Sequence, residues 1–111
     1  MGWTLNIEYT DNFLKEAKQL SKKFKLLKQD LKELIQDITI NKDFGTDLGS
    51  NLYKKRLKNS SIPTGKSGGF RVIIYYQVEN SIVLISIYSK TQKDSISDEE
   101  IEDIIKNYLK K

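Results

Sequence analysis

Hydrophobic and polar residues alternate at the start of the chain and then change to a helical spacing. Every second residue from Leu5 to Tyr9 is apolar, which is the period of a half-buried strand. Apolar residues then recur every three or four positions in residues 13–20 and again in residues 24–38. With Thr10 or Asp11 available as the first N-cap, the pattern predicts a strand followed by a helical hairpin that packs on a sheet.

The second half of the chain returns to a period of two. Residues 41–51 are rich in turn-forming residues, and we expect them to form a loop. Apolar and polar residues then alternate in residues 52–58, 69–78 and 81–89. With Glu79-Asn80 as a tight turn between the last two segments, the pattern predicts an antiparallel meander.

A capping box indicates one more helix at the end of the chain. Ser97 precedes Glu100 by three residues, and apolar residues from Ile101 to Leu109 follow at helical spacing. The order of strand, two helices, three strands and helix predicts an α+β fold with an antiparallel sheet, an N-terminal helical hairpin and a C-terminal helix. We expect residues 1–111 to form a single domain, since a second core would have too few residues to close.

Composition excludes several classes of chemistry. The chain contains neither histidine nor cysteine, so disulfides, thiolate zinc sites and a cysteine nucleophile are excluded. Any catalysis must then rely on Lys, Arg, Tyr, Asp, Glu or Ser. No acidic cluster has metal-ligand spacing, and we expect no metal and no cofactor. No export signal and no membrane-spanning apolar run is visible, which favours a cytoplasmic protein.

The net charge of +4 favours a polyanionic partner and is also compatible with an ordinary basic protein. Strand alternation places Lys54 and Arg56 on one face of their strand, and Arg71 interrupts an otherwise apolar strand. If these strands are neighbours, the three cations converge on one surface, as stabilising a phosphodiester requires. The competing interpretation is that cations on a sheet face, like the lysines on the two helices, are only solvated or protect strand edges.

Four further residues extend the candidate site, and one of them, Lys66, lies in a glycine-rich segment. Lys90 and Lys93 follow the last strand, and Tyr88 near its end is either a stacking residue for RNA bases or part of the packing. Gly65-Lys66-Ser67 is not a phosphate-binding P-loop, because Ser60 stands where the first glycine is needed and a strand follows instead of a helix. Lys66 still offers a phosphate contact.

Three segments in register resemble the RelE/ParE superfamily of toxins, and HigB-like members in particular. They are LYKKRL (52–57), GKSGGFRVIIYY (65–76) and ISIYSK (85–90). The resemblance implies a small RelE-like fold and a toxin of a type II toxin–antitoxin system that is neutralised by an antitoxin. It further implies metal-independent cleavage of messenger RNA in the ribosomal A site, in which the 2′-hydroxyl attacks the adjacent phosphate and leaves a 2′,3′-cyclic phosphate. Operator DNA would be bound only through the complex with the antitoxin.

The resemblance also assigns roles by position. Lys54 and Arg56 resemble the paired basic residues of the central strand, Arg71 the arginine that steadies the phosphate, and Lys90 the lysine after the last strand. These four residues are the expected catalytic set. The expected substrate-binding residues are Lys66, Lys93 and Tyr88.

The chain departs from the RelE pattern at three positions. Thr91 replaces an arginine and Ser97 replaces a tyrosine, so the general acid is unassigned and Lys93 is the candidate substitute for the arginine. Arg56, which is effectively always protonated, is a poor base. Lys55 stands where the family has an apolar core residue, from which we expect a shifted or locally exposed strand.

Two alternatives to the ribonuclease remain open from the sequence. A ParE-like toxin that inhibits DNA gyrase without cutting RNA would share the fold. A non-catalytic RNA-binding or interaction module would also be compatible, because no general acid is visible. The cations on the sheet face favour the ribonuclease, because an inhibitor need not assemble them.

Overall fold

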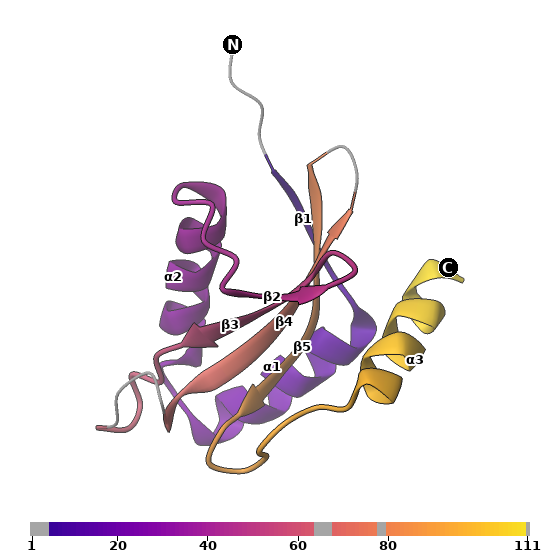
Figure 1. Ribbon diagram of the computed structural model, residues 1–111. Coiled ribbons are helices and arrows are strands. Elements are labelled where there is room, and N and C mark those ends of the chain that lie inside the picture. The colour runs from indigo at the N-terminus through magenta and orange to yellow at the C-terminus, as the bar shows by residue number, and fades with distance from the viewer. Residues whose placement is uncertain (1–4, 64–67, 78–79, 111) are drawn as a thin grey trace.

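The computed structural model describes residues 5–63, 68–77 and 80–110, and it has an α+β fold. Its elements are β1 (Asn6–Tyr9), α1 (Asp11–Lys23), α2 (Leu27–Thr39), β2 (Thr46–Gly49), β3 (Leu52–Leu57), β4 (Phe70–Gln77), β5 (Ser81–Ser89) and α3 (Asp98–Leu109) (Figure 1). The strands form a five-stranded sheet in the order β1-β5-β4-β3-β2. The predicted fold class is therefore confirmed, with the helical hairpin, the meander and the closing helix in the expected places.

Two details of the sheet differ from the expectation. Residues 41–51 contain the short strand β2, which pairs antiparallel with β3 through Thr46 and Lys54. All four residues of β2 are exposed, so no hydrophobic alternation could mark the strand in the sequence. In addition, β1 pairs with β5 in parallel, which makes the sheet mixed. Alternation reports the burial of a strand and carries no information about its direction.

The two helix caps and the turn between the last strands can be compared with their predictions. The Thr10 side chain accepts a hydrogen bond from the Phe13 amide and caps α1, and Ser97 and Glu100 form the predicted capping box of α3. The predicted turn lies partly outside the described residues. Asn80 is described, and its φ of 63° is typical of a tight hairpin turn.

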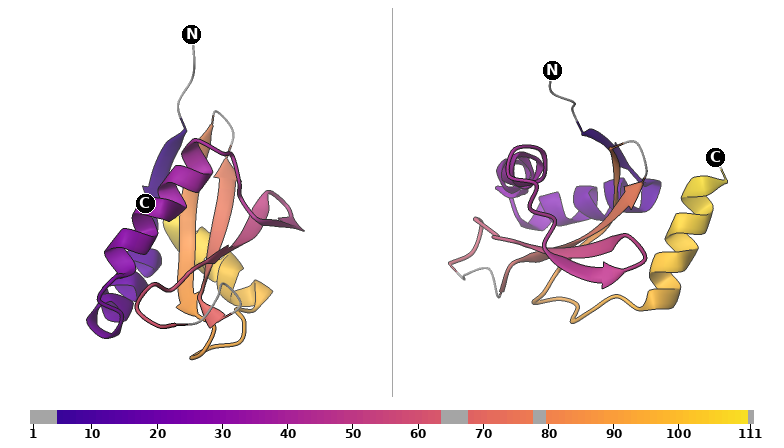
Figure 2. Two further views of the ribbon diagram at one scale, coloured as in Figure 1. Left: turned by 90° about the vertical axis from the view of Figure 1, so that its left-hand side faces the viewer. Right: turned by 45° about the horizontal axis from the view of Figure 1, so that its top comes forward.

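The sheet separates α1 and α2 from α3 (Figure 2), and each of its faces carries an apolar layer. On one face, which we call the hairpin face, α1 and α2 cover a core that includes Phe70, Val72 and Ile74 of β4. On the other face, the α3 face, α3 packs through Ile101 against a smaller cluster that includes Ile73 of β4. The alternation predicted for β4 is thus confirmed, and Arg71 lies on the α3 face.

Lys55 of β3 corrects an expectation, because the strand is neither shifted nor locally exposed. The Lys55 side chain is only 5% exposed and lies on the hairpin face. Its Nζ is 2.9 Å from Asp43 Oδ2 and 3.5 Å from Asp37 Oδ2. A lysine can occupy this core position because carboxylates from α2 and from the following segment neutralise its charge.

We predict that removing one carboxylate of this cluster destabilises the fold, whereas removing the buried charge does not. Asp43→Asn should lower the free energy of unfolding by about 1 kcal/mol, since Asp43 is largely exposed and solvent screens the pair. Lys55→Met, which fills the site without a charge, should be neutral or stabilising within about 1 kcal/mol.

Urea unfolding of these two variants and of Asp103→Asn, an exposed α3 control, measures the effect. If Lys55→Met were more destabilising than Asp43→Asn, the ion-pair account of this position would be wrong.

Candidate functional site

The strand register aligns three side chains in one row across the sheet. Arg56 of β3 pairs with Arg71 of β4, and Arg71 pairs with Tyr88 of β5. Residues that pair directly across strands project from the same face of a sheet, so this basic row lies on the α3 face. Lys54 lies on the same face in the next row, where it pairs with Ile73. The structure therefore brings Lys54, Arg56 and Arg71 to one face, as expected if their strands are neighbours, and it places Tyr88 beside them.

The basic row lies beyond the part of the sheet on which α3 packs. Ile101 of α3 belongs to a cluster with Ile73, Val83 and Ile85. The row is nearer the other end of these strands, adjacent to the pairing of Phe70 with Ser89. Because α3 covers only one end of this face, its other end carries the cations.

The two arginines of the row differ strongly in exposure. Arg71 is 7% exposed, and its Nη1 donates a hydrogen bond to the Phe70 carbonyl oxygen at 3.3 Å. Burial lowers the pKa of Arg71, and the positive charge of Arg56 lowers it further. An arginine remains protonated at neutral pH despite such a shift. Arg56 is exposed and Lys54 is half-buried. An incoming phosphate would therefore meet Arg56 and Lys54 before Arg71.

Tyr88 carries an unsatisfied buried hydroxyl. The residue is 4% exposed, and its Oη has no hydrogen-bond partner in the described part of the chain. Burial raises the pKa of Tyr88, while Arg71 opposes this shift, so the phenol keeps its proton at neutral pH. A buried hydroxyl without a partner costs about 1–3 kcal/mol, and such a group calls for an explanation.

The remaining predicted site residues lie beside the basic row or outside the residues that the structure describes. The Lys90 amide continues the pairing of β5 with β4 by donating to the Gly69 carbonyl oxygen, and Lys90 Nζ donates to the Asp94 carbonyl oxygen at 2.7 Å. Lys93 Nζ is 5.8 Å from the centroid of the Tyr88 ring and 3.2 Å from Glu100 Oε2. Lys66 lies outside the described residues.

The structure adds an acidic residue, Glu16 of α1, that the sequence analysis did not single out. The pairing of β1 with β5 ends at Leu84, which leaves the next carbonyl and amide groups of β5 without a neighbouring strand. Side chains from the start of α1 hydrogen-bond these groups instead. Thr10 and Asn12 donate hydrogen bonds to the Ile85 carbonyl oxygen, and Glu16 Oε1 accepts one from the Ile87 amide at 3.1 Å.

Glu16 is held firmly at this edge. Its Oε1 also accepts hydrogen bonds from Ser86 Oγ at 2.7 Å and from Asn12 Nδ2 at 2.8 Å. Burial raises the pKa of Glu16 above its usual range, although these hydrogen bonds and Lys93 oppose the shift. In the sequence, Glu16 sits beside the apolar stripe of α1. The sequence does not show that Glu16 lies near β5, because this depends on where β1 ends in the folded sheet.

Glu16 and Tyr88 line the same cavity, which has a volume of about 360 Å³. The residues around it are Glu16, Gln19, Leu20, Lys23, Ile87, Tyr88, Ser89, Gln92 and Lys93. The cavity therefore adjoins the basic row through Tyr88. Within the described ranges, no group of three or more Asp or Glu residues is arranged to hold a metal ion.

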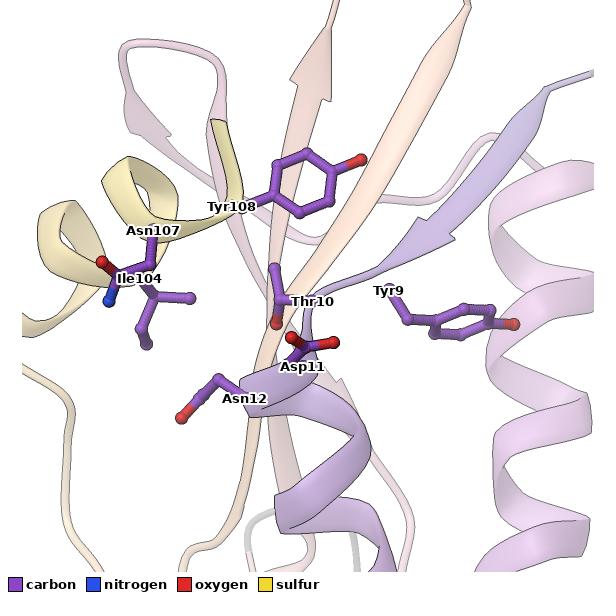
Figure 3. Close-up of a pocket in the computed structure, with 7 residues that line it drawn as sticks. All are labelled: Tyr9, Thr10, Asp11, Asn12, Ile104, Asn107 and Tyr108. Atoms are coloured by element: carbon purple, nitrogen blue, oxygen red, sulfur yellow. The ribbon is translucent and has the colours of Figure 1, made fainter. Parts of the chain in front are cut away.

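A second cavity, of about 320 Å³, lies between the start of α1 and the last turns of α3 (Figure 3). Its lining residues are Tyr9, Thr10, Asp11, Asn12, Ile104, Asn107 and Tyr108. None of the predicted site residues lines it, so we place the candidate site at the basic row. Among the helices that the structure describes, none has the length and apolar character that crossing a membrane requires.

Comparisons with known proteins agree with the fold described above. A family model described as the RelE toxin of the RelE/RelB toxin–antitoxin system matches residues 10–110. The chain is similar to the structure of a mutant E. coli toxin RelE in the free state, with 16% identity over 95% of this chain and 98% of that chain and a TM-score of 0.59. The mutant RelE in complex with an antitoxin RelBc peptide matches with 19% identity, 91% and 94% coverage and a TM-score of 0.49. No curated protein sequence matches the chain.

We predict that Glu16 and Glu100 affect the pH dependence of stability in opposite directions. The pKa of Glu16 is raised, mainly by burial, so its contribution to stability is present below pH 4.5 and is lost as the pH rises through the folded-state pKa. The pKa of Glu100 is lowered by its hydrogen bond with Ser97 and by Lys93, so its contribution is present above pH 4.5 and is lost as the pH falls further.

Urea unfolding across this pH range compares the wild type with Glu16→Gln and Glu100→Gln. Relative to Glu16→Gln, the wild type should gain stability as the pH falls from neutral towards 4.5. Relative to Glu100→Gln, it should lose stability below 4.5. Equal slopes for both variants would contradict the assigned environments.

Proposed function

The chain belongs to the family of RelE toxins of toxin–antitoxin systems, and from this premise we propose that it acts as a metal-independent messenger-RNA endoribonuclease. The observation that carries the proposal is the basic row, in which Arg56 and Arg71 pair across the sheet with Lys54 beside them. Cations fixed by a rigid sheet stabilise the charge that develops on a phosphodiester during cleavage. An interaction module would not need a buried arginine next to a buried tyrosine hydroxyl that has no partner in the described part of the chain.

The proposed reaction transfers the phosphoryl group within the RNA strand. The 2′-oxygen forms a bond to the adjacent phosphorus while the bond from phosphorus to the 5′-oxygen breaks, which leaves a 2′,3′-cyclic phosphate and a 5′-hydroxyl. The 2′-hydroxyl proton is lost to a base, and the leaving 5′-oxygen gains a proton. Arg71 stabilises the charge on the non-bridging oxygens, with Arg56 contributing from the exposed side of the row.

Lys54, Lys90 and Tyr88 complete the proposed site. Lys54 contacts the 2′-oxygen and serves as base or as electrostatic support. Lys90 contacts the phosphate once it leaves the Asp94 carbonyl oxygen. Tyr88 is the candidate proton donor, because its hydroxyl is protonated, lies in the row beside Arg71 and has no partner among the described residues. Tyr88 would thus act as the general acid, which the sequence analysis left unassigned.

The proposal extends to partners and location. We propose that the toxin acts on messenger RNA in the ribosomal A site in the cytoplasm. A cognate antitoxin inhibits it by covering the basic row, and operator DNA is bound only through the toxin–antitoxin complex. Support for an antitoxin comes from the family, whose description pairs the toxin with RelB.

We expect substitutions in the basic row to slow RNA cleavage strongly. Arg56→Ala should retain the fold because the side chain is exposed, and it should lower the cleavage rate by a factor on the order of 10². Arg71→Ala should lower it by about 10²–10³. Because Arg71 is buried, Arg71→Lys provides a second variant that keeps charge and most of the volume but loses the planar fork.

Inducing each variant in a bacterium and mapping RNA 5′ ends provides the measurement, with Lys28→Ala on the exposed side of α2 as the matched control. The wild type and the control should produce growth arrest with new codon-spaced ends in messenger RNA. Growth arrest without such ends would rule out the ribonuclease, and gyrase-type DNA breaks would identify a ParE-like inhibitor instead.

Tyr88→Phe should separate stability from activity. Removing the unpartnered hydroxyl relieves a buried polar group, so the free energy of unfolding should rise by about 1 kcal/mol. The same change should reduce cleavage by a factor on the order of 10²–10⁴, which is the usual contribution of a positioned acid. Urea unfolding and single-turnover cleavage measure the two effects, and unchanged cleavage by Tyr88→Phe would remove the tyrosine from the proton-donor role.

A further inference from the structure

The cavity at the free edge of β5 combines three kinds of surface. Leu20, Ile87 and Tyr88 are the apolar and aromatic residues that line it, and all three are largely buried. Gln19 and Gln92 supply amides, and Lys23 and Lys93 supply positive charge. At about 360 Å³ the cavity falls within the size range of small-molecule sites.

Glu16 gives the cavity a fixed hydrogen-bond acceptor. Three donors hold its Oε1, namely the Ser86 hydroxyl, the Ile87 amide and the Asn12 side-chain amide. Its Oε2 accepts no hydrogen bond from the described residues, and this oxygen is not among their buried unsatisfied atoms. The orientation of the carboxylate is thus set by the protein, while one oxygen stays available to a ligand.

The occupant that fits these surfaces is a nucleotide. The volume accommodates a base, a donor group on the base matches Glu16 Oε2, and a phosphate matches the lysines. Lys93 is paired with Glu100, but both side chains are partly exposed, so a phosphate can compete for this cation. Tyr88 belongs both to the cavity and to the basic row, so a base in the cavity and a phosphate at the row can belong to one RNA strand.

We propose that this cavity binds adenine or cytosine, whose exocyclic amino group stands where guanine and uracil carry a carbonyl oxygen and donates a hydrogen bond to Glu16 Oε2. This inference rests on the proposed function, since it identifies part of the RNA that the toxin would cleave. A fixed acceptor discriminates between bases, because cytosine presents an amino group where uracil presents a carbonyl oxygen. A carbonyl facing Oε2 would leave the carboxylate unpaired and repelled.

Replacing Glu16 with glutamine should invert the base preference of the cavity, because the two side chains have the same shape. In Glu16→Gln, the amide oxygen can take the place of Oε1 and keep its three donors. The amide nitrogen then takes the place of Oε2 and turns an acceptor into a donor. The variant should therefore favour a carbonyl-bearing base, and it should remain folded because the hydrogen bonds to β5 are retained.

Titration of the full chain with CMP and UMP, followed by NMR at about pH 8 to keep the carboxyl ionised, tests the proposal. We expect the wild type to bind CMP roughly tenfold more tightly than UMP, and Glu16→Gln to lose or reverse this preference. Glu102→Gln, which makes the same charge change on the exposed side of α3, should behave as the wild type.

Three results would overturn the proposal: no binding at millimolar nucleotide, equal affinities of the wild type for CMP and UMP, or an unchanged preference in Glu16→Gln. The titration requires no RNA cleavage. A CMP preference that depends on Glu16 would therefore support base binding in the cavity even if mapping of RNA 5′ ends gave no cleavage. Cleavage without this preference would support the ribonuclease and contradict base binding in the cavity.

Discussion

The antiparallel register of β3, β4 and β5 determines which side chains meet on each face of the sheet. It aligns Arg56, Arg71 and Tyr88 in one row. A slip of one residue would turn Arg71 into the core beneath α1 and α2 and bring Phe70 to the opposite face. Lys55 opposes such a slip, because its ion pairs with Asp37 and Asp43 form only while it faces the helices. A buried cation on one face thus helps to hold the basic row on the other.

The basic row combines features that are unfavourable for folding and suited to binding an anion. Arg71 and Tyr88 are both buried, and the tyrosine hydroxyl is unpartnered among the described residues. Groups that are already oriented and removed from water need little rearrangement when charge develops beside them. The stability lost here is supplied by the two apolar layers, and this division between site and core is common in proteins.

Much of the site could be predicted from local pattern, and the rest depends on where elements end in space. Alternation alone placed Arg71 on the face opposite to that of Phe70 and Val72, because successive side chains of a strand point to opposite faces. Glu16 escaped prediction since its partners are on β5, some seventy residues away in sequence. Lys55 was misjudged because a single strand does not reveal carboxylates from α2 and the segment after it. The fully exposed β2 left no hydrophobic signal.

The side chains that complete the edge of β5 have a consequence for assembly. Thr10 and Asn12 donate hydrogen bonds to the Ile85 carbonyl oxygen, and Glu16 accepts one from the Ile87 amide. These main-chain groups therefore cannot pair with a strand of another molecule. This stretch of β5 is thereby protected against pairing with another strand. The same glutamate lines the cavity beside the basic row. A substitution that shortens this side chain, such as Glu16→Ala, would therefore expose a stretch of strand edge and alter the cavity at the same time.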